Sequence, residues 1–83
     1  MDIGKLVRMA NQIAKNLDYG QDREKVVAAT ADHLKRFWTP EMRRQIVAYH
    51  LEGGDPAGEV DPLSELAANA VARIAEEQRK DVA

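Results

Sequence analysis

The side chains that could do chemistry in this 83-residue sequence are few, and their spacing does not suit catalysis. Ser64, the only serine, follows Asp61 by three residues, as at a helix start, where a hydroxyl bonds the local backbone and does not attack a substrate. The two histidines, His33 and His50, fall on different predicted helices and lack the spacing of a metal-binding pair. The absence of cysteine excludes disulfides, thiolate nucleophiles and iron–sulfur ligation. We therefore predict no catalytic residue, no metal site and no cofactor bound by this chain.

The most unusual part of the sequence is the corner segment, residues 33–46, where an aromatic pair meets a helix boundary among four basic side chains. Aromatic and arginine residues are the usual energetic anchors of protein interfaces. The corner segment therefore predicts a protein-binding surface. Its predicted contact residues are Arg36, Phe37, Trp38, Pro40, Met42, Arg43 and Arg44, with His33 and His50 as secondary candidates.

Helices must position these residues, because alternating apolar residues, the signal of a strand, are missing throughout. Apolar residues at helical spacing predict a first helix over residues 3–17, which a loop at residues 18–21 ends. Asp22 is a suitable N-cap for a second helix that runs to about Phe37.

Two Pro-containing pairs predict the remaining helix starts. Thr39 followed by Pro40 supplies a hydroxyl cap and a proline at the first helical position, and this third helix should end at Gly53-Gly54. Asp61-Pro62 is again a capping residue followed by a proline, and it predicts the start of a fourth helix, which should reach about Arg79. The expected fold is all-α: one domain over residues 1–75, a small compact bundle of three to four short helices, followed by a frayed tail over residues 76–83.

The second helix has a wider apolar arc than one neighbouring helix requires. One column contains Leu34 and Trp38, and the next contains His33 and Phe37. Together the columns span roughly 160 degrees of the helical wheel, against about 100 for an ordinary amphipathic stripe. One column can therefore pack inside while the other faces a partner, or the other helices can cover both. Of the two aromatic residues, Phe37 is a better candidate for the interface than Trp38.

Arg43 and His50 lie inside the apolar arc of the third helix, between Met42 on one side and Leu51 on the other. A buried arginine must be paired to offset its desolvation. Arg43 should therefore meet a carboxylate of its own chain, extend to solvent, or be reserved for a partner.

Composition limits the remaining possibilities. Of the 37 hydrophobic residues, 13 are alanines, so the core should be thin and a partner surface could complete it. Charge is uneven: residues 1–50 carry nine Lys/Arg against six Asp/Glu, and residues 51–83 carry three against eight. No apolar run has the length of a membrane span or the form of a signal peptide, so we expect no membrane association and a cytoplasmic location.

The sequence resembles the delta subunit of soluble NAD-dependent formate dehydrogenases. The resemblance covers roughly residues 5–75. It rests on residues 6–14 (LVRMANQIA), on the corner segment (HLKRFWTPEMRRQI), and on Asp61-Pro62-Leu63 followed by Ala70-Val71.

The resemblance implies a non-catalytic accessory chain of a complex that oxidises formate with NAD. In that family the catalytic alpha subunit holds a molybdenum or tungsten bis-pterin cofactor and iron–sulfur clusters, and the beta and gamma subunits pass electrons through flavin (FMN) to NAD. The delta chain is associated with assembly, cofactor insertion or stability of the active molybdoenzyme. The expected partner is therefore the alpha subunit, within a hetero-oligomer of alpha, beta and gamma.

Two alternatives remain open. Basic side chains around aromatics on short helices also suit a helix-turn-helix-like nucleic-acid-binding regulator, although a net charge of −2 and a pI near 5.6 argue against nucleic acid as a partner. A self-associating helical protein is the other alternative, because the fourth helix is rich in small residues.

Overall fold

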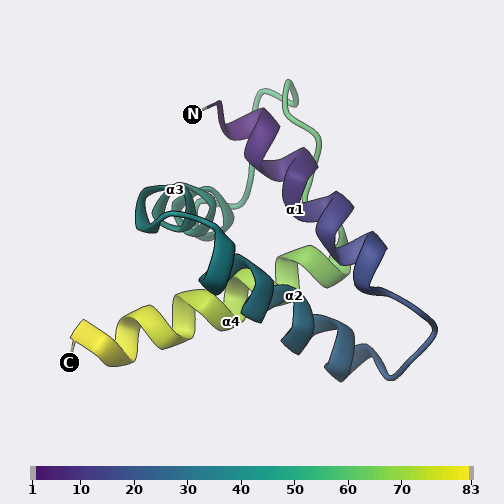
Figure 1. Ribbon diagram of the computed structural model, residues 1–83. Helices are drawn as coiled ribbons and strands as arrows, with labels where there is room; N and C mark the ends of the chain where they lie inside the picture. The colour runs from purple at the N-terminus through teal and green to yellow at the C-terminus, as the bar shows by residue number, and fades with distance from the viewer. Residues whose placement is uncertain (1, 83) are drawn as a thin grey trace.

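The computed structural model describes residues 2–82, with side-chain surroundings through Arg79, and contains four α-helices and no strand within that range (Figure 1). The helices are α1 (Ile3–Leu17), α2 (Arg23–Phe37), α3 (Pro40–Leu51) and α4 (Glu65–Val82). The prediction of an all-α bundle is confirmed.

Short polar side chains cap the first three helices. Asp2 accepts from the backbone N–H of Gly4 at the start of α1, and Asp22 accepts from that of Glu24 at the start of α2. Thr39 Oγ1 accepts from the N–H of Met42 at 3.2 Å. The predicted caps at Asp22 and Thr39, and Pro40 in the first position of α3, are therefore confirmed.

The predicted start of the fourth helix at Asp61-Pro62 is wrong, because α4 begins at Glu65 with Ser64 as its cap. Ser64 Oγ accepts from the N–H of Ala67 at 3.3 Å, which confirms the local backbone role predicted for this hydroxyl. The side chain of Asn11 on α1 holds the chain just before the helix. It donates to Pro62 O at 3.1 Å and accepts from the N–H of Ser64 at 2.7 Å. These two bonds use the backbone groups that an earlier helix start would need.

The end of α3 follows from two glycines with positive φ. The N–H of Gly53 (φ 87°) donates to His50 O, and the N–H of Gly54 (φ 93°) donates to Tyr49 O. This pair of bonds is a Schellman motif, which an L side chain at either glycine would strain. The predicted stop at Gly53-Gly54 therefore holds, with the last helical residue at Leu51.

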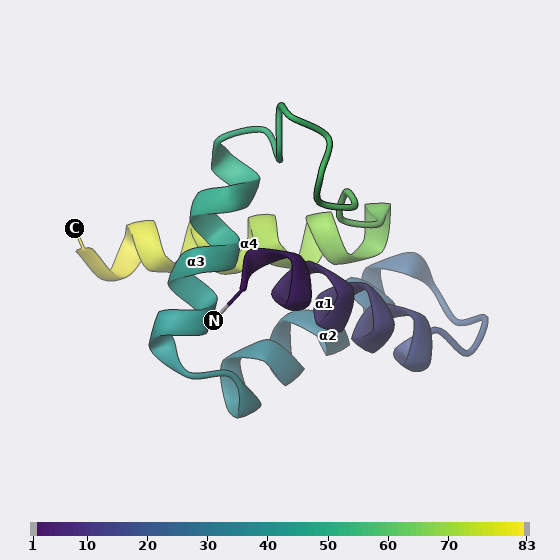
Figure 2. The ribbon, with the colours of Figure 1, turned by 90° about the horizontal axis from the view of Figure 1, so that it is seen from above.

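The core is built from a few large side chains and many alanines. α1 and α4 each pack against the other three helices, and Figure 2 shows α4 passing behind α3. The largest fully buried apolar side chains are Leu6, Val7, Val26, Leu34, Ile46, Val71 and Ile74. The alanines buried with them are Ala10, Ala14, Ala31, Ala67, Ala70 and Ala75. The expected thin core is confirmed by these small residues, which bring the helices close together without adding much apolar area.

The C-terminal turns of α4 extend beyond the other helices (Figures 1 and 2). The helix continues to Val82, past the predicted end near Arg79. Fraying of residues 76–83 stays a prediction, and Ala83 lies outside the described residues. Among the described helices, none combines the length and the apolar character that crossing a membrane requires.

Candidate docking surface

The turn between α2 and α3 places two neighbouring aromatic rings in opposite environments. α2 ends at Phe37 and α3 begins at Pro40, so only Trp38 and Thr39 connect them. Phe37 is 70% exposed, whereas Trp38 is 5% exposed and belongs to the core cluster. The expectation that Trp38 acts as an interface anchor is corrected: its ring mainly fills the core. Phe37 is the ring available to a partner.

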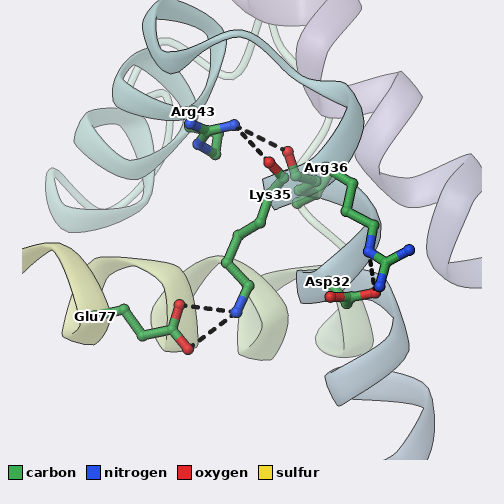
Figure 3. Close-up of polar contacts among 6 residues, drawn as sticks. Asp32, Lys35, Arg36, Arg43 and Glu77 are labelled. Atoms are coloured by element: carbon green, nitrogen blue, oxygen red, sulfur yellow. Dashed lines mark hydrogen bonds and ion pairs between the residues drawn. The ribbon is translucent and has the colours of Figure 1, made fainter.

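Arg43 is held by the backbone at the end of α2. Its Nη1 donates to Lys35 O at 3.0 Å, to Leu34 O at 3.4 Å and to Trp38 O, so the guanidinium faces the C-terminal turn (Figure 3). The last carbonyls of a helix have no partner within the helix, and the helix dipole favours a cation there. The observed acceptors of Arg43 are thus backbone carbonyls of its own chain, which give it a structural role at the α2–α3 turn, and the predicted contact of Arg43 with a partner stays a prediction.

Replacing Arg43 by alanine should lower the free energy of unfolding by about 1.5–3 kcal/mol, because bonds from a charged donor to three carbonyl oxygens are lost. Arg44→Ala is the matched control, since the Arg44 side chain is 70% exposed and, among the side chains that the structure describes, pairs only with Glu41. The control should stay within about 0.5 kcal/mol of the original chain. Urea unfolding followed by circular dichroism measures both values. Equal effects of the two substitutions would contradict the role given to Arg43.

The other basic side chains of the corner segment are exposed and form ion pairs with the chain itself; Figure 3 shows the pairs of Arg36 and Lys35. Arg36 pairs with Asp32 at 3.1 Å, Arg44 with Glu41 at 3.2 Å, and Lys35 with Glu77 of α4 at 3.0 Å. Exposed pairs of this kind contribute about 0–1 kcal/mol. A partner carboxylate can therefore replace Asp32 or Glu41 at little cost.

Beside Phe37 lies the α1–α2 groove, an open hollow of about 430 Å³. Its lining residues are Met9, Gln12, Ile13, His33, Phe37, Trp38 and Met42. The rings of His33 and Phe37 contact each other, with centroids 4.7 Å apart and planes tilted by 46°. Four predicted residues, His33, Phe37, Trp38 and Met42, are thus brought together, although Trp38 contributes only from its place in the core.

The wall that α1 contributes to this groove was not predicted from the sequence. Met9 and Ile13 are one turn apart and are both partly buried, at the edge of the apolar arc of α1. Their position at the edge of the arc was the available signal, since such residues can face a neighbouring helix and solvent together.

Two other residues predicted to bind a partner, Pro40 and His50, lie outside the α1–α2 groove. Pro40 is exposed at the first turn of α3 and does not line the groove. His50 is half-buried near the far end of α3, beside the loop that contains Gly53 and Gly54. The structure therefore separates His50 from the other candidates.

The described residues contain no group of three or more His, Cys, Asp or Glu side chains that could hold a metal ion. The one serine hydroxyl caps α4, and the ring of His33 packs on Phe37. The arrangement at the corner, an exposed aromatic ring over an apolar groove among exchangeable ion pairs, is suited to binding another macromolecule.

Comparison with known proteins identifies the family. The family model for the NADH-dependent formate dehydrogenase delta subunit FdsD matches residues 5–71, which include most of α1, all of α2 and α3, and the first turns of α4. Searches of curated proteins and of solved structures gave no match. The match covers most of the chain and confirms the family that the sequence resembles. The matched range also contains all the lining residues of the α1–α2 groove. This protein belongs to the delta-subunit family of NADH-dependent formate dehydrogenases.

Proposed function

We propose that this chain is a non-catalytic accessory subunit that docks on the catalytic alpha subunit of a formate dehydrogenase. Membership of the delta-subunit family supports a place in that complex. The observation that carries the docking role is Phe37, which is 70% exposed at the edge of an apolar groove. A large aromatic side chain left in water next to such a groove gains by burial against a partner.

The docking surface comprises the α1–α2 groove and the exposed arginines Arg36 and Arg44. Phe37 and Met42 supply apolar contact area, and the two arginines meet acidic groups of the alpha subunit. Arg43 contributes indirectly, because it holds the turn that presents Phe37. Central aromatic anchors of interfaces are worth about 2 kcal/mol or more each.

The chemistry of the complex belongs to the partners in this proposal. The molybdenum or tungsten bis-pterin and the iron–sulfur clusters reside in the alpha subunit, FMN serves the electron path to NAD in the beta and gamma subunits, and the complex works in the cytoplasm. The delta chain supports assembly, cofactor insertion or stability of the active enzyme. A protein that binds the assembled form in preference to the unassembled one stabilises it by mass action, without taking part in the reaction.

Deleting the gene for this chain in its native host tests the supporting role. Without the chain, we expect purified alpha subunit to contain less molybdenum or tungsten, and the extract to reduce less NAD with formate. Supplying the chain from a plasmid should restore both quantities. Equal metal content per alpha subunit and equal specific activity with and without the chain would contradict the proposal.

A further inference from the structure

The α1–α2 groove has a definite size and chemistry. One wall is Met9 and Ile13 of α1, with Gln12 beside them, and the other is His33 and Phe37 of α2. Trp38 and Met42 complete the lining. Each wall is a pair of residues four apart, which is about one helical turn or roughly 6 Å. Thioether side chains adapt their shape to the apolar group they meet. The groove therefore fits one or two bulky apolar side chains.

The outer face of α1, next to this groove, carries unpaired positive charge. Lys5, Arg8 and Lys15 are exposed, and the sequence from Ile3 to Leu17 contains no acidic residue. Across the described side chains these three form no ion pair, whereas five other Lys and Arg side chains do. Lys5 lies one turn before Met9, within ~40° of it around the helix. One edge of the groove is therefore basic and open to a partner carboxylate.

The opposite edge carries one arginine, whose charge is paired with Asp32 of the same helix. Arg36 directly precedes Phe37 in the chain, and its side chain is 71% exposed on a weak surface pair with Asp32. Charges exposed in this way can exchange partners when a second protein approaches. An apolar centre with a lysine on one side, unpaired among the described side chains, and an exchangeable arginine on the other is complementary to an acidic amphipathic surface.

From this complementarity we infer that the α1–α2 groove receives an acidic amphipathic segment of the alpha subunit. The segment inserts one or two bulky apolar side chains, a helical turn apart, between Met9 and Phe37. Its Asp or Glu residues meet Lys5 on one side and Arg36 on the other. The inference rests on the proposed function, because the partner is the alpha subunit.

A second copy of the chain fits the groove less well. In a symmetric dimer the same patch faces itself, so the two basic α1 faces would be brought close to each other. Like charges placed together across an interface disfavour association. The charge pattern thus favours a different, acidic partner over self-association.

Photo-crosslinking in the assembled enzyme tests the occupant. Phe37 is replaced by p-benzoylphenylalanine in the tagged chain, and the same replacement at Leu51, which is also 70% exposed, serves as the matched control. After irradiation and purification, mass spectrometry should find the adduct of position 37 on an alpha-subunit peptide rich in Asp and Glu around a large apolar residue. The control position should give no adduct with that peptide.

Other outcomes overturn the inference in distinguishable ways. If the chain co-purifies with the alpha subunit but crosslinks only from position 51, the groove assignment is wrong and the proposed function stands. An adduct with a second copy, with nucleic acid, or with a neutral or basic peptide of the alpha subunit also contradicts the inference that an acidic segment occupies the groove. If the tagged chain does not co-purify with the alpha subunit, the proposed function and the inference fall together.

Reversing the charge of Lys5 tests the basic edge of the groove through the affinity for the alpha subunit. Lys5→Glu should weaken binding to the alpha subunit about tenfold, which corresponds to ~1.4 kcal/mol. Lys25→Glu changes an exposed lysine at the same third position of its helix, on α2, and should change the affinity less than about twofold. Titration calorimetry measures both values. Equal losses in the two variants would contradict a basic edge specific to this groove.

Discussion

The isolated Trp38→Ala variant should be largely unfolded at room temperature, whereas Phe37→Ala should keep the fold and the melting temperature. Trp38 is 5% exposed and Phe37 70% exposed, although the two are adjacent in the chain. Truncating a buried large aromatic residue costs about 3–5 kcal/mol. A domain of this size sits at the lower end of the usual stability of about 5–15 kcal/mol, so little reserve remains.

Thermal unfolding followed by far-ultraviolet circular dichroism measures this contrast. The Phe37→Ala variant is the internal control, because it removes a ring of similar chemistry from the next position. A Trp38→Ala variant with an unchanged melting temperature would show that the Trp38 ring lies outside the core. A collapse of the Phe37→Ala variant would show that the exposed ring supports the fold.

The second large effect concerns binding. Phe37→Asp should weaken the affinity for the alpha subunit about 30-fold or more, which corresponds to a loss of about 2 kcal/mol or more. The substitution removes the exposed ring and puts a charge at the edge of an apolar groove. Because position 37 is exposed, the free chain should remain helical.

Leu51→Asp is the control for this binding prediction, since Leu51 is also 70% exposed but lies at the far end of α3. It should bind the alpha subunit as the original chain does. Calorimetry with purified alpha subunit gives the affinities, and circular dichroism verifies that each variant is folded. Loss of binding in Leu51→Asp with normal binding in Phe37→Asp would move the interface away from the α1–α2 groove.

Most helix boundaries could be predicted because they depend on local chemistry. A carboxylate at Asp22 and a hydroxyl at Thr39 before Pro40 satisfy free N–H groups within their own first turns. The start of α4 could not be predicted in this way. It depends on Asn11, which lies 53 residues before Ser64 in the chain and binds the backbone there. Long-range contacts of this kind leave no local signal.

The candidate site was predictable in composition but not in geometry. The wide apolar arc of α2 indicated two columns of residues, but the sequence does not show which column the neighbouring helices cover. In the structure Trp38 is buried and Phe37 is exposed. Arg43 was recognised as needing a partner. Its actual partners are backbone carbonyls, which every residue possesses, so residue types alone could not point to them.

The central claim, docking on the alpha subunit, is tested most directly by affinity purification of the tagged chain from its native host. We predict that the formate dehydrogenase alpha subunit co-elutes with the chain in a fixed stoichiometric ratio. The contradicting result is a chain that elutes alone or as a homodimer while the alpha subunit remains in the unbound fraction.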